Sequence, residues 1–141
     1  MSVERAINNM NAADHTFRSA LRQHRLAPPD AGFGRRLKDF ADACESQQIA
    51  CEYAAQERLG WEPLPPARRP PPPELRPDSG RRGPKELWAT FDIRWEDLSE
   101  ALEGISLAAI ARAFDELATI ARQLSASVAE EDIAILRAQQ A

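Results

Sequence analysis

Apolar residues recur at steps of three and four positions between residues 107 and 128. Side chains at this spacing lie on one side of an α-helix, so the stretch predicts a helix with an apolar side that packs against other helices. The pattern suits a neighbour in the same chain or in another chain. We expect it to contact a protein partner or a second copy of the chain. The residues of this apolar side are Leu107, Ile110, Phe114, Leu117, Ala121, Leu124 and Val128.

Three other stretches show the same period and predict three further helices. The first begins at residue 2 or 3 and ends near 24, the second runs from about 31 to 59, and the third from about 84 to 103. Because the breaks within each pair of helices are short, each pair is expected to form an antiparallel hairpin. The three apolar stripes contain Val3, Ile7, Met10, Phe17 and Leu21; Phe33, Leu37, Phe40, Cys44 and Cys51; and Leu87, Phe91, Trp95, Leu98 and Leu102.

Capping residues mark the ends of these helices. Asp30 and Ser106 are expected to cap the second and fourth helices, because their side chains accept hydrogen bonds from the first turn. Gly104 is the expected stop of the third helix. Two polar residues, Gln47 and Gln48, interrupt the second apolar stripe, where a polar residue can fix the register between helices at some cost in stability.

Residues 61–84 separate the two predicted hairpins. Eight prolines lie between Pro63 and Pro77, and Pro84 follows. Proline lacks the backbone N–H that helices and sheets need, so this segment is expected to be a stiff polyproline II rod. It is long enough to cross the length of a helical bundle or to act as a spacer between two separate hairpins.

These patterns predict an all-α protein with two antiparallel helical hairpins, residues 1–60 and 85–141, joined by the proline- and arginine-rich linker 61–84. The hairpins are expected to pack as a four-helix-like bundle or to pair through a dimer. Two alternatives remain for residues 129–141. The capping-box pattern from Ser127 to Glu130 favours a short separate helix, and a continuous helix that frays is equally consistent.

Charge and composition narrow the classes of partner. The net charge of −4 is uneven: residues 61–84 carry +2 and residues 85–141 carry −6. An acidic surface repels phosphate backbones, so we expect no nucleic-acid partner for the C-terminal hairpin. No apolar run is long enough to span a bilayer, and we see no signal peptide. Cys44 and Cys51 are too far apart on one helix for a disulfide, which suggests reduced, buried thiols in the cytoplasm.

The chain contains no pattern typical of an active site. Glu100 and Glu103 have the Glu-x-x-Glu spacing of metal-binding helical bundles, but no matching partner motif accompanies them. We therefore interpret them as a solvated helix face, and we expect no catalytic residue, metal, cofactor or small-molecule substrate.

The linker carries a second candidate contact. Its residues Pro63, Pro66 and Arg68, with Arg69 beside them, fit a proline-rich pattern that binds SH3-type grooves. Such patterns also arise by chance in linkers rich in proline and arginine, and a solvated spacer is the alternative.

Taken together, these features predict a non-enzymatic helical interaction protein of the bacterial cytoplasm: an adaptor, an accessory subunit or a self-assembling, homo-oligomeric bundle. A nucleic-acid-associated regulator that uses the linker arginines is the first alternative. A metal-dependent hydrolase of helical-bundle type is the second.

Overall fold

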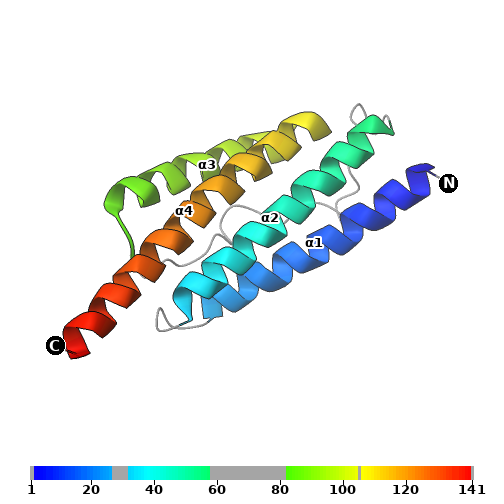
Figure 1. Cartoon of the computed structure of the whole chain (residues 1–141). Coiled ribbons are helices and arrows are strands. Elements are labelled where there is room, and N and C mark those ends of the chain that lie inside the picture. Colours follow the sequence, from blue (N-terminus) through cyan, green and yellow to red (C-terminus); the bar gives the residue numbers. More distant parts are fainter. Residues whose placement is uncertain (1, 27–31, 58–81, 105, 141) are drawn as a thin grey trace.

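The computed structural model describes residues 2–26, 32–57, 82–104 and 106–140. Over these ranges the chain forms four α-helices and no strand. The helices are α1 (Ser2–Leu26), α2 (Phe33–Gln56), α3 (Lys85–Glu103) and α4 (Leu107–Gln140). They lie together as an elongated bundle (Figure 1). The predicted all-α, four-helix-bundle-like fold is confirmed.

The two helical hairpins pack against each other. The contact between α2 and α4 is the most extensive in the bundle; α1 packs on α2, and α3 packs on α4. Buried residues of all four helices belong to one continuous apolar core. Of the two arrangements that the sequence left open, the chain therefore adopts the one in which both hairpins share a core.

Aromatic side chains from all four helices meet in the centre of this core. The centroid of the Phe17 ring on α1 lies 5.2 Å from that of the Phe114 ring on α4, in an edge-on arrangement. It lies 5.6 Å from the centroid of the Phe40 ring on α2. Phe40 in turn lies 6.2 Å from Trp95 on α3. Ring pairs at these separations stabilise a core beyond the burial of their area. The rings therefore connect the N-terminal hairpin to the C-terminal one.

The ends of α3 and α4 follow the local signals in the sequence. The Ser106 hydroxyl accepts a hydrogen bond of 3.2 Å from the backbone N–H of Ala109, as an N-terminal cap does. Gly104 follows the last residue of α3. Pro84 precedes α3 in extended backbone, with φ −64° and ψ 141°, instead of forming its first residue. The predicted cap Asp30 lies outside the described residues.

The fourth helix is continuous from residue 107 to residue 140. The hypothesis of a separate last helix after the Ser127–Glu130 pattern is therefore wrong, and the alternative of one unbroken helix holds. The reason is physical: a serine followed by acidic residues starts a helix only where the preceding backbone is already non-helical. Here Leu124 and Val128 are buried in the core and hold this turn in the helix.

A glycine allows the chain to enter α3 close to α4. Gly83 has a φ of +99°, which L-residues with a side chain rarely adopt. A Cβ at this position would lie 3.3 Å from Leu124 Cδ2. The indole N–H of Trp88 donates a hydrogen bond to the carbonyl oxygen of Arg82, the residue before Gly83. These contacts fix the start of α3 against the middle of α4.

Candidate interaction surfaces

The apolar side predicted for residues 107–128 belongs to α4 and lies in the interior of the bundle. All seven of its residues are buried, at no more than 3% exposure, within the core that α4 shares with its neighbours. The pattern suits a neighbouring helix in the same chain or in another chain, and in the structure these residues pack against helices of the same chain. An external partner has no access to these side chains while the bundle is folded. These residues are Leu107, Ile110, Phe114, Leu117, Ala121, Leu124 and Val128.

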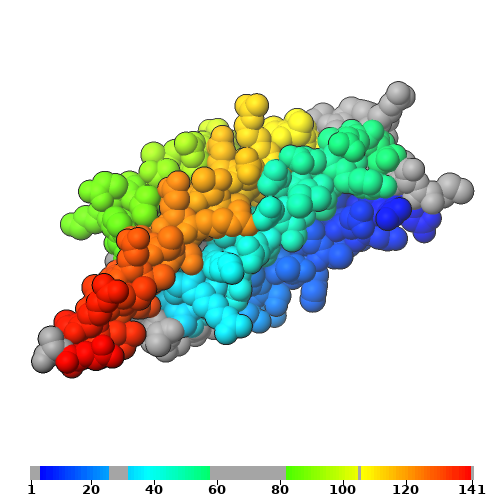
Figure 2. Space-filling model, viewed as in Figure 1, coloured from blue at the N-terminus to red at the C-terminus, as the bar shows by residue number. Residues whose placement is uncertain are grey.

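Beyond Val128 the same helix changes character. Residues 129–140, which we call the α4 extension, project past the other three helices (Figures 1 and 2). Val128 is fully buried, whereas Ile133, Ile135 and Leu136 are 49%, 48% and 57% exposed. Three of the five large apolar side chains that stand exposed among the described residues thus lie within four positions of each other. Grouped exposed apolar side chains of this kind are typical of binding surfaces.

The base of the α4 extension is fixed to the bundle by charge. Arg82, just before α3, forms an ion pair with Asp132, and its guanidinium lies 5.5 Å from the centre of the Phe33 ring on α2. The Arg82 side chain is 17% exposed and that of Asp132 is 39% exposed, so this pair is shielded from solvent on the arginine side. Asp132 is therefore already engaged within the chain, whereas the residues that follow it are exposed.

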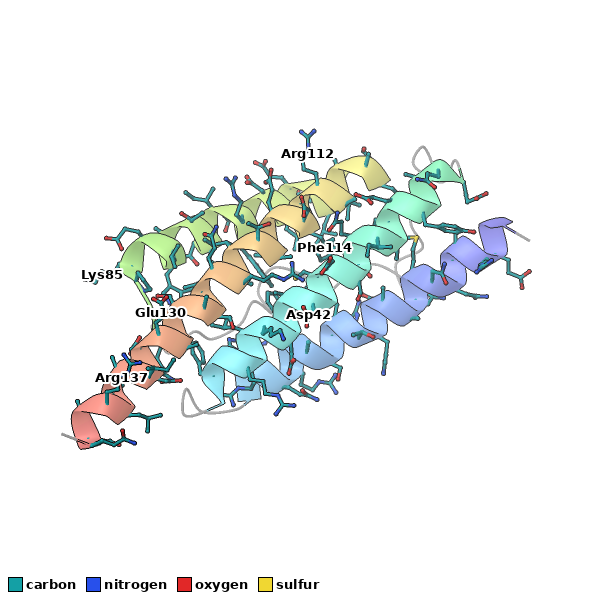
Figure 3. The ribbon with its side chains drawn as sticks, viewed as in Figure 1. Asp42, Lys85, Arg112, Phe114, Glu130 and Arg137 are labelled. Atoms are coloured by element: carbon teal, nitrogen blue, oxygen red, sulfur yellow. The ribbon has the colours of Figure 1, made fainter. Side chains whose placement is uncertain are left out.

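A groove of about 600 Å³ between α3 and α4 forms a second surface feature. It is lined by four alanines and by the charged residues Asp97, Glu100, Arg112 and Glu116. Arg112 points away from the bundle in Figure 3. Arg94 Nη1 lies 3.1 Å from Asp97 Oδ2 and 3.6 Å from Glu116 Oε2. The positive charge of Arg94 therefore neutralises part of the acidic lining.

Only one of the two glutamates considered as metal ligands from the sequence lines this groove. Glu100 lines it, whereas Glu103 is exposed on the last turn of α3 and does not. Among the described residues, no three histidine, cysteine, aspartate or glutamate side chains are grouped to hold a metal ion. What the groove offers chemically is an acidic surface interspersed with alanines.

Among the described residues, the buried polar side chains lie on α1 and α2 and are Asp14, His24 and Gln47. Asp14 is 6% exposed and accepts a hydrogen bond of 2.9 Å from Arg18. Burial raises the pKa of this carboxyl, and the hydrogen bond and charge of Arg18 oppose the shift only partly. Gln47 is fully buried, and neither of its amide atoms has a hydrogen-bond partner among the described residues.

The two cysteines are free and buried on α2. Burial raises the pKa of the Cys44 thiol well above its ordinary value, and it raises the pKa of Cys51 to about 12, with smaller contributions from Glu52 and Asp14. Nucleophilic catalysis requires the thiolate, which this environment disfavours. The geometry therefore fits the predicted packing role of both residues.

The four linker residues of the candidate docking motif, Pro63, Pro66, Arg68 and Arg69, lie outside the described residues. The exposed apolar group on the α4 extension was not singled out from the sequence. Its signal was available, because Ile133, Ile135 and Leu136 follow an acidic run directly. The period alone did not reveal that the bundle ends before them.

Comparison with known proteins places the chain in no family. No family model matches it, and neither characterised proteins nor solved structures give a match. Within the described residues, none of the helices combines the length and the apolar character needed to cross a membrane.

Proposed function

We propose that the chain is a non-enzymatic helical interaction protein and that the α4 extension, residues 129–140, is its binding element. One observation carries this proposal: a helix that is buried up to Val128 continues as helix with Ile133, Ile135 and Leu136 about half exposed. Isolated exposed apolar residues are common on monomers, but a group on a projecting helix is a typical contact surface for another helix.

The physical support is the free energy that remains available on association. Apolar area removed from water contributes about 25 cal/mol per Å², and these three side chains retain roughly half of their area in solvent. Ile133 and Leu136 lie on one side of the helix, so a partner helix that covers these two gains this contribution without unfolding the bundle, because the core ends at Val128. The contact is apolar, so it favours a protein partner over the alternatives of a nucleic-acid-associated regulator and a metal-dependent hydrolase.

The cytoplasm is the compartment that we propose for this function. The support is that Cys44 and Cys51 are free, buried thiols, a state that reducing compartments maintain. The adaptor or accessory-subunit role and the bacterial source remain parts of the same proposal, as does a homo-oligomeric assembly.

Site-specific photo-crosslinking in the cells that naturally make the chain tests the binding element. A photoreactive residue replaces Leu136 in one variant and Ile93 in a matched control; both positions are 57% exposed, but Ile93 stands alone on α3. We expect a discrete crosslinked product from position 136 and none from position 93. Equal products from both positions, or none from either, would contradict the proposal.

A further inference from the structure

We propose that the α4 extension pairs with the same segment of a second copy of this chain, antiparallel and about a two-fold axis that passes between Ile133 and Ala134. This inference rests on the proposed function and names its partner. The spacing of the apolar residues, the charges beside them and the shape of the bundle all point to a second copy as the partner.

Four residues of the α4 extension have the spacing of a coiled-coil seam. The apolar Ala129, Ile133 and Leu136 and the polar Gln140 follow at steps of four, three and four, which are the d, a, d and a positions of a heptad. Ile135 lies outside this seam, at an outward position. In the proposed antiparallel pair, Ile133 packs against Ile133 and Leu136 of the second copy. Leu136 packs between Ile133 and Ala129 of that copy. The seam is therefore complementary to itself, as a two-fold interface requires.

The charges beside this seam select the antiparallel orientation. Glu130 and Arg137 are seven positions apart, so they lie on the same flank of the seam but about 10 Å apart along the axis, too far to pair within one chain. Both are exposed (labelled in Figure 3). In an antiparallel pair each flank faces the same flank of the other helix. Glu130 of each copy then lies opposite Arg137 of the other, and two ion pairs form at once.

A parallel pair is less compatible with the structure. It would bring the flank of Glu130 and Arg137 against the other flank, which carries Asp132 and Gln139. Asp132 is already paired with Arg82 of its own chain. A parallel pair would also force the two bundles side by side, whereas the antiparallel pair keeps them at opposite ends of the joined helices, as the projection of the extension in Figure 2 permits.

The expected affinity is low. Twelve residues of helix span about 18 Å. Two such segments bury less than the ~1,200 Å² that stable interfaces need at the least. The dimer should therefore form and dissociate with concentration, with a dissociation constant in the micromolar range or weaker, on the order of 10⁻⁵ M.

Sedimentation equilibrium of the full chain tests whether the dimer exists. The molar mass should rise from 15.7 kDa towards twice that value as the concentration increases. The rise should disappear in Ile133→Ser and Leu136→Ser and persist in Ile93→Ser, because Ile93 is as exposed as Leu136 but lies on α3. A chain that stays monomeric at every concentration would overturn the inference. A crosslink from position 136 to a different protein would then still support the proposed function.

Charge exchange tests the antiparallel register. Glu130→Arg alone and Arg137→Glu alone should each weaken the dimer about tenfold, because two attractive contacts become repulsive. A mixture of the two variants should associate like the unchanged chain, and so should the double variant. Glu131→Arg, at the outward position beside Glu130, is the matched control and should leave the dimer unaffected. If the mixture fails to associate while helical circular dichroism is retained, the register is wrong.

Discussion

Ser125 on α4 donates a hydrogen bond of 2.6 Å from its hydroxyl to the carbonyl oxygen of Gly34, in the first turn of α2. The two residues are 91 positions apart in the sequence. Gly34 has no side chain, so the two helices approach closely here, and Val128 lies over the same glycine. This contact is one turn before the point at which α4 leaves the bundle. It marks the boundary between the buried and the exposed parts of that helix.

The two glycines that face α4 should respond in opposite ways to alanine. A Cβ on Gly34 would meet its nearest neighbour at 3.5 Å, an ordinary van der Waals contact. Gly34→Ala should therefore stabilise the fold by about 0.5 kcal/mol through helix propensity. Gly83→Ala should destabilise it by about 1–2 kcal/mol, because its φ of +99° is unfavourable for alanine and its Cβ would lie 3.3 Å from Leu124. Chemical denaturation measures the free energy of unfolding of each variant. Changes of the same sign in the two variants would contradict the backbone conformation given for one of the two glycines.

Gln47 should be replaceable by an apolar side chain with a gain in stability. Its amide is fully buried and has no hydrogen-bond partner among the described residues. Methionine has nearly the same shape and no polar atoms to desolvate. Gln47→Met should therefore raise the free energy of unfolding by about 1 kcal/mol. Gln56→Met, the same change at an exposed position of α2, is the matched control and should have little effect. A loss of stability in Gln47→Met would mean that the amide is bonded in solution.

Asp14 should make the fold less stable as the pH rises from acid. Burial raises the pKa of its carboxyl above the ordinary value of 3.8. A group whose pKa is raised in the folded state stabilises the fold fully below its unfolded pKa and loses that contribution as the pH rises through the folded pKa.

The comparison that isolates this effect uses Asp14→Asn, which has no charge to desolvate. The free energy of unfolding of the unchanged chain, relative to Asp14→Asn, should fall as the pH increases from 3.8 into the range just above it. Urea denaturation at a series of pH values gives this difference. A constant difference would mean that the ion pair with Arg18 cancels the effect of burial on the pKa, and a difference that rises with pH would mean that the ion pair outweighs it; either result would contradict the prediction.

The thiols should be protected in the native state. With the pKa of Cys51 near 12 and that of Cys44 raised well above normal, neither thiolate is populated at neutral pH, and both side chains are buried. Iodoacetamide at pH 8 should label both cysteines only after denaturant is added. Mass spectrometry of peptides from native and unfolded samples reports this, and rapid labelling of either thiol in the native chain would contradict its placement in the core.

Periodicity and capping residues predicted the elements of the fold well. The steps from Leu107 to Val128 located a buried helix face, and the hydroxyl of Ser106 forms the expected cap. These signals are local, and each depends on a few neighbouring residues.

Features that depend on distant contacts could not be read from the sequence. Nothing local shows that Phe17 meets Phe114, or that Gln47 is enclosed without a partner. The α4 extension is the clearest case: Ile135 continues the period of the buried face, and it is exposed because the neighbouring helices end, not because its own pattern changes.

The central claim is that α4 divides at Val128 into a part that builds the bundle and a part that is free to associate. Leu117 and Leu136 are the same residue type on this one helix, at 0% and 57% exposure. The most direct test is the free energy of unfolding of Leu117→Ala and Leu136→Ala, measured by chemical denaturation in dilute solution. We predict a loss of about 2–5 kcal/mol for Leu117→Ala and a change within about 0.5 kcal/mol for Leu136→Ala. Similar losses for both would contradict the division and place the α4 extension inside the folded core.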